Sequence, residues 1–367
     1  MSTFFSNPKA GFKDKKKQIL AAISKFIDSG EYILGTNVKK FEDEFKQFLG
    51  NKGYFVSCAS GTDAITLALL TYGIKGKIIV PSHTATASII AIQKAGCEPV
   101  YAEINPETLL TSIANIQTLL QKDKNIKAVL AVHLYGSGMD MNRLSLVAKS
   151  FQCIVIEDCA QSCGTIIHKK QSGTLSSAGC FSFFPTKNLP ALGDGGGLWL
   201  PNKKMKEKAE SIRQYGWNQR RIVCTPDGMN SRLDEIQAVV LRIRLKDLQK
   251  DIIKRRNIAN LYDMKLSNKF KIIHQASHQQ SSYHLYIVRV KNREKLISYM
   301  KKRDIFMGIH YYPSNHMNGI LKNQDPNLKV TEKISREVVS LPIFPELSKV
   351  KQIDIIKHLN NFLELKS

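Results

Sequence analysis

Lys187 stands at a position in the sequence where a lysine could be reactive. It follows an apolar run at 179–183 that predicts a strand, and it precedes a Gly- and Pro-rich stretch at 188–197. Because ligands of open parallel sheets bind at the carboxyl ends of the strands, we expect this lysine at the functional edge of a sheet. A lysine withdrawn from water loses its charge more easily and attacks carbonyl groups, as Schiff-base chemistry requires. On position alone, a solvated surface lysine is the more common case.

Asp158 directly follows a second apolar run, at 153–157. A carboxylate at the end of a strand can bind a metal, cap a helix or pair with a protonated ring nitrogen. In enzymes that use pyridoxal phosphate (PLP), such a carboxylate keeps the pyridine ring protonated, so that the ring can withdraw electrons. The combination of Lys187 with Asp158 is therefore more specific than either residue alone, and it predicts a PLP site.

Ser60, Gly61 and Thr62 lie between a predicted strand at 54–57 and a predicted helix at 63–72. Small residues at a helix N-terminus offer free backbone N–H groups, which bind anions. Alone the signal is weak, because serine and threonine commonly cap helices. Beside Lys187 it provides a place for the cofactor's phosphate, to which the hydroxyl of Ser182 could contribute.

Short apolar runs and longer amphipathic stretches alternate through the first part of the chain. The helical patterns include 63–72, 86–95 and 144–150, and the predicted strands are 54–57, 78–80, 100–103, 128–133, 153–157, 179–183 and 196–200. This rhythm predicts an α/β fold in which a mostly parallel, mixed sheet lies between helices.

The remainder of the chain predicts a second, smaller domain. The segment 229–250 has the pattern of one long helix that leads out of the large domain. The strand-like run at 283–290 and the region from residue 295 to the end indicate an α+β lobe. We therefore divide the chain into a large PLP-binding domain, 1–245, and a small C-terminal domain, 246–367.

The composition is that of an ordinary globular protein with a sizeable core, since 43% of its 367 residues are hydrophobic and 23% are charged. The sequence contains no apolar run of membrane-spanning length and no secretory pattern at its start, so we expect a cytoplasmic protein. Its seven cysteines are scattered without paired CxxC motifs, and we predict no metal site.

The formal net charge of +23 raises the question of a nucleic-acid partner. A basic face can bind nucleic acid, but it is more often a solvated surface. The lysines here are spread along helix-like segments, and no base-stacking aromatic motif accompanies them. We therefore expect no nucleic-acid partner.

A series of motifs, in this order, resembles the DegT/DnrJ/StrS family of sugar-nucleotide aminotransferases. The motifs are the segment 35–42, SGT from Ser60, EDCAQ at 157–161, SFFPTKN at 182–188, GDGG at 193–196, NSRLDEIQA at 230–238, HYYPSNH at 310–316 and SLPIFP at 340–345. The resemblance covers roughly residues 27 to 345. It implies a PLP-dependent enzyme of fold type I that forms a homodimer with shared active sites.

The resemblance also implies roles for residues at the matching positions. Lys187 would hold PLP and shuttle a proton, Asp158 would pair with the ring nitrogen, and Gln161 would lie near the ring oxygen. The phosphate would be held by Gly61, Thr62 and Ser182 and by Asn230 of the other subunit, and the substrate would lie near His310 and His316. The implied donor is L-glutamate. The acceptor is a keto sugar on dTDP, UDP or GDP, aminated at carbon 3 or 4 for polysaccharide or glycoconjugate synthesis.

One position departs from the family pattern. The family carries an aromatic residue that stacks on the PLP ring in a loop beginning with proline, whereas the aligned residue here is Ala85. His83, in the same loop, either takes over the stacking or is an ordinary loop histidine.

Other kinds of protein fit the sequence less well. A nicotinamide-dependent enzyme needs GxGxxG, but the nearest match, at Gly136 and Gly138, has Met141 in place of the third glycine. PLP-dependent sugar dehydratases of the same fold replace the lysine with histidine, and Lys187 argues against that reaction. A non-catalytic regulatory protein on this scaffold would not need Lys187, Asp158 and the phosphate loop together.

Overall fold

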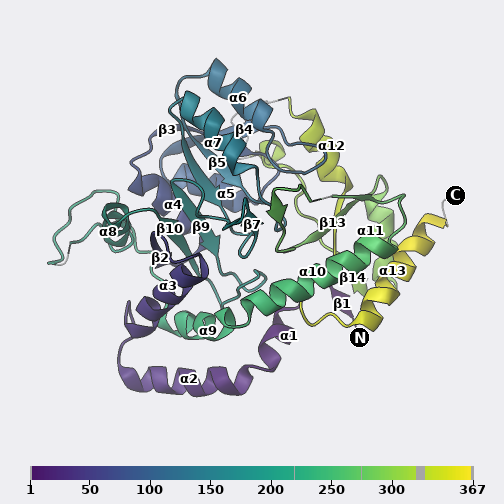
Figure 1. The fold of residues 1–367 in the computed structure, drawn as a ribbon, viewed down its shortest axis with the longest axis horizontal. Helices are drawn as coiled ribbons and strands as arrows, with labels where there is room; N and C mark the ends of the chain where they lie inside the picture. The colour runs from purple at the N-terminus through teal and green to yellow at the C-terminus, as the bar shows by residue number, and fades with distance from the viewer. Residues whose placement is uncertain (1, 219, 274, 320–326, 365–367) are drawn as a thin grey trace.

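The centre of the molecule is a seven-stranded mixed sheet in the order β2-β10-β9-β6-β5-β3-β4 (Figure 1). The computed structural model describes residues 2–218, 220–273, 275–319 and 327–364. The strands are β2 (Tyr54–Cys58), β3 (Gly76–Pro81), β4 (Cys97–Ala102), β5 (Ile126–Val132), β6 (Ile154–Asp158), β9 (Ala178–Ser182) and β10 (Gly196–Leu200). Neighbours from β9 to β4 run parallel, whereas β10 runs antiparallel to both β9 and β2. The predicted α/β architecture is confirmed.

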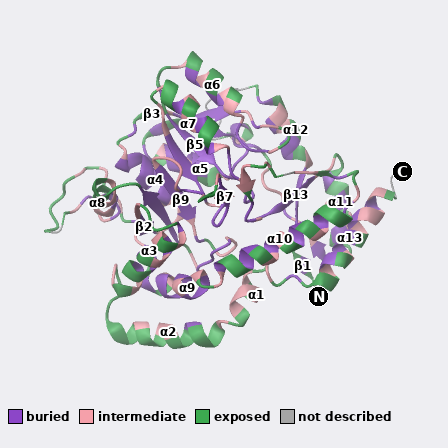
Figure 2. Ribbon diagram, in the orientation of Figure 1, coloured by how far each residue is buried: buried purple, intermediate pink, exposed green. Residues whose placement is uncertain are grey.

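Helices cover the sheet, as a largely parallel sheet requires. They include α3 (Thr36–Phe48), α4 (Gly61–Thr71), α5 (Thr86–Lys94), α6 (Ile113–Lys122), α7 (Met141–Ser150) and α8 (Lys203–Ile212). Helix α4 packs on β9, β10 and α5, and its residues from Ala64 to Thr71 are all buried. Figure 2 shows the sheet and α4 as the buried interior, with exposed residues on the outer helices.

Alternation along β9 directs its side chains to two different sides of the sheet. Phe181 packs with Phe45 and Phe55 in an aromatic cluster beside α3. Because successive strand residues point to opposite faces, Cys180 and Ser182 face α4, where the Cys180 thiol contacts the carbonyl of Ala64. This alternation places the Ser182 hydroxyl at the N-terminus of α4.

The prediction of one long helix at 229–250 is wrong. The structure has two helices, α9 (Glu235–Leu245) and α10 (Leu248–Lys265), preceded by an extended segment. Asp234 has extended backbone angles at the start of α9, and Asn230 forms a β-bridge with Gln214. This extended pairing uses the backbone groups of the segment before Glu235, so the helix cannot start earlier.

A second core lies beyond α9. Its antiparallel sheet contains β11 (Lys271–Ile272), β13 (Tyr286–Arg289) and β15 (Val338–Leu341). With α10, its helices are α11 (Arg293–Lys301), α12 (Lys329–Glu337), the 3-10 turn η1 (Asn315–Met317) and α13 (Lys349–Glu364). One hydrophobic cluster, between Ile258 and Phe362, is drawn from this part of the chain alone. The division into 1–245 and 246–367 stays a prediction.

The start of the chain also packs against this second part. Strand β1 (Thr3–Phe4) pairs in parallel with β14 (Ile305–Phe306), and α1 (Pro8–Lys13) and α2 (Lys16–Ser29) follow it. A small sheet of β7 (Ile166–Ile167), β8 (Lys170–Gln171) and β12 (Gln279–Gln280) joins the two parts of the chain. Among the described residues, no helix combines the length and the apolar character that crossing a membrane requires.

Candidate active site

The carboxyl ends of β6 and β9 deliver the two residues on which the PLP prediction depends. The strands are parallel neighbours, with Asp158 in register with Cys180. Asp158 is the last residue of β6, and Lys187 follows the end of β9 in a turn, where its N–H donates to the carbonyl of Phe184 (2.8 Å). The negative charge of Asp158 acts directly on the Lys187 amine. The structure thus brings Lys187 and Asp158 together at one edge of the sheet.

The Lys187 amine is largely removed from water. Burial lowers its pKa to about 8, although the nearby charge of Asp158 acts in the opposite direction. A pKa of about 8 leaves on the order of a tenth of the amine uncharged at pH 7, far more than for an exposed lysine, and only the uncharged amine attacks a carbonyl. The site therefore suits nucleophilic chemistry at Lys187.

Hydrogen bonds to both oxygens fix the position of the Asp158 carboxyl group. Its side chain is buried, with Oδ2 accepting from the Ser88 hydroxyl (2.8 Å) and Oδ1 accepting from the N–H of Ala160 (3.0 Å). Ser88, on α5, was not predicted from the sequence, because a serine within a helix carries no signal of this contact.

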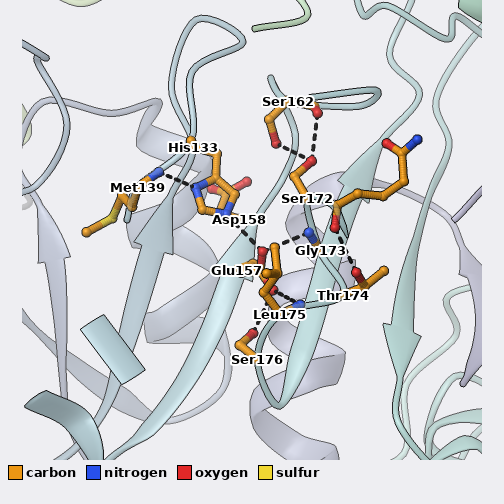
Figure 3. Close-up of polar contacts among 12 residues, drawn as sticks. His133, Met139, Glu157, Asp158, Ser162, Ser172, Gly173, Thr174, Leu175 and Ser176 are labelled. Carbon is orange, nitrogen blue, oxygen red and sulfur yellow. Dashed lines mark hydrogen bonds and ion pairs between the residues drawn. The ribbon is translucent and has the colours of Figure 1, made fainter. Parts of the chain in front are cut away.

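Glu157, the residue before Asp158, anchors the end of β6 (Figure 3). Its carboxylate is fully buried and accepts hydrogen bonds from the N–H groups of Gly173 and Leu175 (both 2.8 Å) and from the Ser176 hydroxyl (3.0 Å). A fourth bond joins it to Nε2 of His133 (3.0 Å). Because neighbouring strand residues point to opposite faces, this anchoring fixes the strand that aims Asp158 at the site.

His133, Glu157 and Cys159 also have ligand atoms within 4.8 Å of one another, as a metal site would require. The His133 ring, however, is fully used. Its Nδ1 accepts from the N–H of Met139 (3.1 Å), so Nε2 carries the proton and donates to Glu157 (Figure 3). Burial and neighbouring carboxylates raise the pKa of the Cys159 thiol, which disfavours the thiolate that a metal needs. The cluster is organised as a structural hydrogen-bond network.

The anion cradle is formed where α4 begins. The Ser60 hydroxyl accepts from the N–H of Asp63 (3.1 Å), so it caps the helix instead of pointing to a ligand. Gly61 lies so close to β9 that a Cβ atom there would be 2.6 Å from Cβ of Ser182. Thr62 is in the first turn of α4. The structure therefore brings Gly61, Thr62 and Ser182 together at a helix N-terminus.

Asn230 lies next to this cradle and is exposed. Its neighbour Ser231 accepts a hydrogen bond from the N–H of Ala59 (3.1 Å) and donates to Asp63 (2.9 Å), which fixes the segment against the start of α4. The chain between α8 and α9, which ends at this segment, projects from the body of the molecule (Figure 1).

His83 is fully buried, and Ala85 lies partly exposed at the N-cap of α5. Nε2 of His83 is hydrogen-bonded to the hydroxyl of Tyr135 (2.6 Å), and Nδ1 has no partner among the described residues. Burial lowers the pKa of His83 to about 4, with His310 contributing. The ring is therefore neutral, and Tyr135 fixes its orientation.

Gln161 and His310 line a cavity beside Lys187. The other lining residues are Phe5, Ser6, Thr186, Arg255, His284, Leu285, Tyr311 and Ile343. The Gln161 amide nitrogen donates to the hydroxyl of Tyr311 (2.6 Å), whose pKa is raised by burial and by Asp158. His310 is bonded through Nδ1 to Ser340 (2.8 Å), and burial together with Lys187 lowers its pKa to about 4.

His316 is placed differently from His310. It is buried, its Nδ1 is bonded to the Ser82 hydroxyl (2.6 Å), and Glu332 lies 3.5 Å from its Nε2. It is not among the residues that line the cavity beside Lys187 in the described part of the chain. Its contacts attach the 310–317 segment to the loop that follows β3.

Sequence reasoning missed Tyr311, His284 and Arg255, which share the cavity with Lys187. Tyr311 lies within a motif that was recognised, and its position between two histidines could have drawn attention to it. Arg255 belongs to a basic stretch of α10, and such a stretch is typical of a helix face exposed to solvent.

The residues present fit PLP. A desolvated amine lies beside a buried, hydrogen-bonded carboxyl group, and a glycine lets a helix N-terminus approach the hydroxyl-bearing end of β9 closely. The sheet order and this site define a PLP-dependent enzyme of fold type I.

The profile of the DegT/DnrJ/EryC1/StrS aminotransferase family matches residues 13–360. The chain belongs to this family. It is 38% identical over 354 residues to the dTDP-3-amino-3,6-dideoxy-alpha-D-galactopyranose transaminase of Aneurinibacillus thermoaerophilus, covering 95% of this chain and 96% of the relative. It is 32% identical to the UDP-2-acetamido-2-deoxy-3-oxo-D-glucuronate aminotransferase of Pseudomonas aeruginosa, covering 93% and 94%.

Solved structures agree with this membership. The crystal structure of DesV from S. venezuelae, in complex with a ketimine intermediate, superposes with a TM-score of 0.95 at 33% identity and covers 99% of both chains. NtdA from Bacillus subtilis, with the bound cofactor PMP, has a TM-score of 0.89 at 25% identity and covers 97% of this chain and 83% of its own. PLP, in its aldehyde and amine forms, is the cofactor of this fold.

Proposed function

We propose that this sugar-nucleotide aminotransferase moves the amino group of L-glutamate to a keto sugar linked to a nucleoside diphosphate, giving an amino sugar for polysaccharide or glycoconjugate synthesis. The observation that carries the proposal is the desolvated Lys187 amine beside the hydrogen-bonded carboxylate of Asp158. The named relatives act on dTDP- and UDP-linked sugars. These two nucleotides are therefore the first candidates for the acceptor.

PLP would supply a carbonyl that takes up the amino group and a ring that withdraws electrons. We assign the attachment of the cofactor to Lys187, whose amine would also take the proton from the α-carbon of the donor and return one to the acceptor carbon of the sugar. Asp158 would pair with the ring nitrogen. Gly61, Thr62 and Ser182 would hold the phosphate, and His83 and Gln161 would help to hold the ring.

We assign the working form to a homodimer in which Asn230 of one subunit completes the phosphate site of the other. Large apolar side chains are exposed around the Lys187 loop and on the projecting segment: Phe184 (48%), Leu192 (51%), Ile236 (36%), Ile222 (57%) and Val223 (61%). Apolar side chains exposed near the reactive lysine would suit burial against a second subunit. The N–H of Leu192 donates to Gln237 on α9 (2.8 Å), which connects this surface to the reactive lysine.

We place the reaction in the cytoplasm. All seven cysteines are free thiols, six of them at least partly buried, and a reducing compartment preserves thiols.

The decisive experiment has two stages. The purified protein, loaded with PLP, should show the near-visible absorbance of a lysine-bound cofactor, which borohydride bleaches and glutamate shifts. A panel of nucleotide-linked amino sugars is then incubated with 2-oxoglutarate, and at least one should yield glutamate. The Lys187→Ala variant should lose both the absorbance and the turnover, and full turnover in that variant would refute the mechanism. A protein with no absorbance and no turnover would instead be a regulatory member built on this scaffold.

A further inference from the structure

Arg255 is a buried cation in the wall of the cavity beside Lys187. Its side chain is 6% exposed, and one guanidinium nitrogen, Nη1, donates to the carbonyls of Tyr283 (3.3 Å), His284 (3.3 Å) and Ile343 (3.0 Å). These bonds fix the side chain but leave its charge in place. In the described part of the chain, Nε and Nη2 have no hydrogen-bond partner, and neither atom is sealed from the surface.

The Arg255 charge is not balanced by contact with an acid. Among the described residues, no carboxylate oxygen lies within 4.0 Å of its guanidinium. Asp251 and Glu346 act on it from a longer distance. Asp251 is already paired with Arg244 (3.0 Å) and lies 3.8 Å from Lys254. Burial lowers the pKa of Arg255 to about 10, so the group remains charged at neutral pH. A buried cation without a partner is costly, and an anionic ligand would offset that cost.

In the described part of the chain, no acidic side chain lines this cavity. Its lining residues between Phe5 and Ile343 include no aspartate or glutamate. Glu346 lines an adjoining cavity that shares Ser6, Thr186, Lys187 and Arg255 with this one, and it acts on Arg255 without an ion-pair contact. Burial raises the pKa of its carboxyl group, which disfavours its charged form.

Two uncharged polar side chains near Arg255 and Lys187, those of Asn188 and His284, each present a hydrogen-bond acceptor. The amide nitrogen of Asn188 donates to the carbonyls of Cys163 (3.4 Å) and Ser282 (3.2 Å), so its oxygen faces His284 as an acceptor. Nδ1 of His284 therefore carries the proton in the 3.3 Å contact with that oxygen, which leaves Nε2 as an acceptor. Burial, Lys187 and Arg255 hold the pKa of His284 far below its usual range.

We propose that Arg255 binds the α-carboxylate of the amino-acid donor and of the keto acid that leaves, with His284 accepting a hydrogen bond from the donor's ammonium group. This rests on the proposed function. The α-carboxylate is bonded to the carbon whose proton Lys187 takes, so the anion must lie in the same cavity as the amine. The diphosphate of a nucleotide sugar is separated from the keto carbon by ring atoms and would lie farther out. A guanidinium and a carboxylate pair with charge-assisted hydrogen bonds.

The first test uses the unmodified holoenzyme and compares glutamate with its α-amide, which retains the amino group and the side-chain carboxylate. Conversion of the cofactor to its amine form is followed by absorbance, without any sugar. We expect kcat/KM for the amide to be lower by about 100-fold, because the buried guanidinium would face an uncharged group. Equal use of both donors would overturn the proposal, whatever any variant does.

The second test uses Arg255→Gln, Arg255→Lys and the matched control Arg256→Gln. Arg256 is the next residue on α10, and its Nε donates to the carbonyl of Ser281 (2.8 Å), outside the cavity. We expect Arg255→Gln to lose the preference for glutamate over its α-amide while its KM for the nucleotide sugar stays unchanged, and Arg255→Lys to retain part of the preference. The control should keep the full preference. A preference that persists in Arg255→Gln would contradict the proposal.

A binding measurement separates this inference from the proposed function. Glutarate carries two carboxylates and no amino group, so its binding can be measured by calorimetry in the absence of turnover. We expect the unmodified protein and Arg256→Gln to bind it, and Arg255→Gln to bind it at least about 10-fold more weakly. Transamination from glutamate could fail while this difference remains, in which case only the proposed function falls. Should all three proteins bind glutarate equally, the assignment of Arg255 falls.

Discussion

Two opposing effects on one amine set the reactivity of Lys187. Burial favours the neutral form, whereas the carboxylate of Asp158 favours the charged form, and the balance holds the pKa at about 8. Ser88 and the N–H of Ala160 donate hydrogen bonds to the two oxygens of Asp158 and fix its carboxyl group in place. A neutral asparagine in its place would keep the shape but not the charge.

The Asp158→Asn variant should bind PLP and turn over slowly. An amide cannot keep the ring nitrogen protonated, so we expect kcat/KM to fall at least about 100-fold while the near-visible absorbance of the bound cofactor remains. Steady-state kinetics and absorbance on the same samples check this. Undiminished turnover would show that Asp158 does not contact the ring.

The pKa of Lys187 also predicts how stability depends on pH without cofactor. Between pH 8 and 10.5 the unfolded chain carries a proton on this amine that the folded chain has lost, so the free energy of unfolding rises with pH in this window. Below pH 8 both states are protonated, and the folded state carries the full cost of the buried charge.

Lys187→Met removes this cost. We expect the cofactor-free variant to be more stable than the unmodified protein at pH 7, by on the order of 2 kcal/mol, and the gap to close as the pH approaches 10. Urea unfolding at several pH values measures it. A gap that is independent of pH would mean that Lys187 is hydrated in the folded protein.

At the scale of elements, the close approach of α4 to β9 forms the anion cradle. A Cβ atom at Gly61 would lie 2.6 Å from Cβ of Ser182, closer than two such atoms can approach. Gly61 therefore allows the helix N-terminus to meet the strand end. The anchor at Glu157 and the aromatic packing of Phe181 fix the two strands that this contact requires.

Gly61→Ala should open this contact. We expect a loss of about 1–3 kcal/mol in stability and weaker binding of PLP, since the backbone N–H groups of the cradle would move. Thermal unfolding and PLP titration of the same variant report the two effects. Gly319→Ala is the matched control, because no atom of the described residues lies within 4 Å of a Cβ atom there. Unchanged PLP affinity in Gly61→Ala would contradict the cradle.

At the scale of the whole molecule, the loop that carries Lys187 also carries exposed apolar side chains, Phe184 and Leu192. The projecting segment between α8 and α9 extends away from the body of its own chain (Figure 1). Both features suit a second copy of the chain packed over the Lys187 loop. Asn230 would then serve the partner's phosphate site.

Mixing two inactive variants tests this arrangement. When Lys187→Ala and Asn230→Ala subunits are exchanged, each mixed dimer should contain one intact site, so about a quarter of the normal activity should return. If Asn230 served its own subunit, no intact site would form and no activity would return. The variants assayed separately set the background, and size-exclusion chromatography confirms that both are dimers.

The sequence by itself determined the elements and the residues at their ends. Local patterns predict all seven strands of the central sheet and place Lys187, Asp158 and the helix start at Gly61 and Thr62 at strand ends. Parallel strands bring their carboxyl ends to one edge wherever the chain goes between them. Such residues can be found without knowing any long-range contact.

Only the tertiary structure decided the rest. The sequence has a helical pattern from 229 to 250. In the structure Asn230 pairs with Gln214 in a β-bridge, and the helix begins only at Glu235. His316 is hydrogen-bonded to Ser82, whereas His310 lines the cavity beside Lys187. Arg255 shares that cavity with Lys187 because α10 packs beside the 283–285 segment. Contacts between residues so far apart in the chain arise from tertiary packing, and they produce no periodic pattern in the sequence from which they could be predicted.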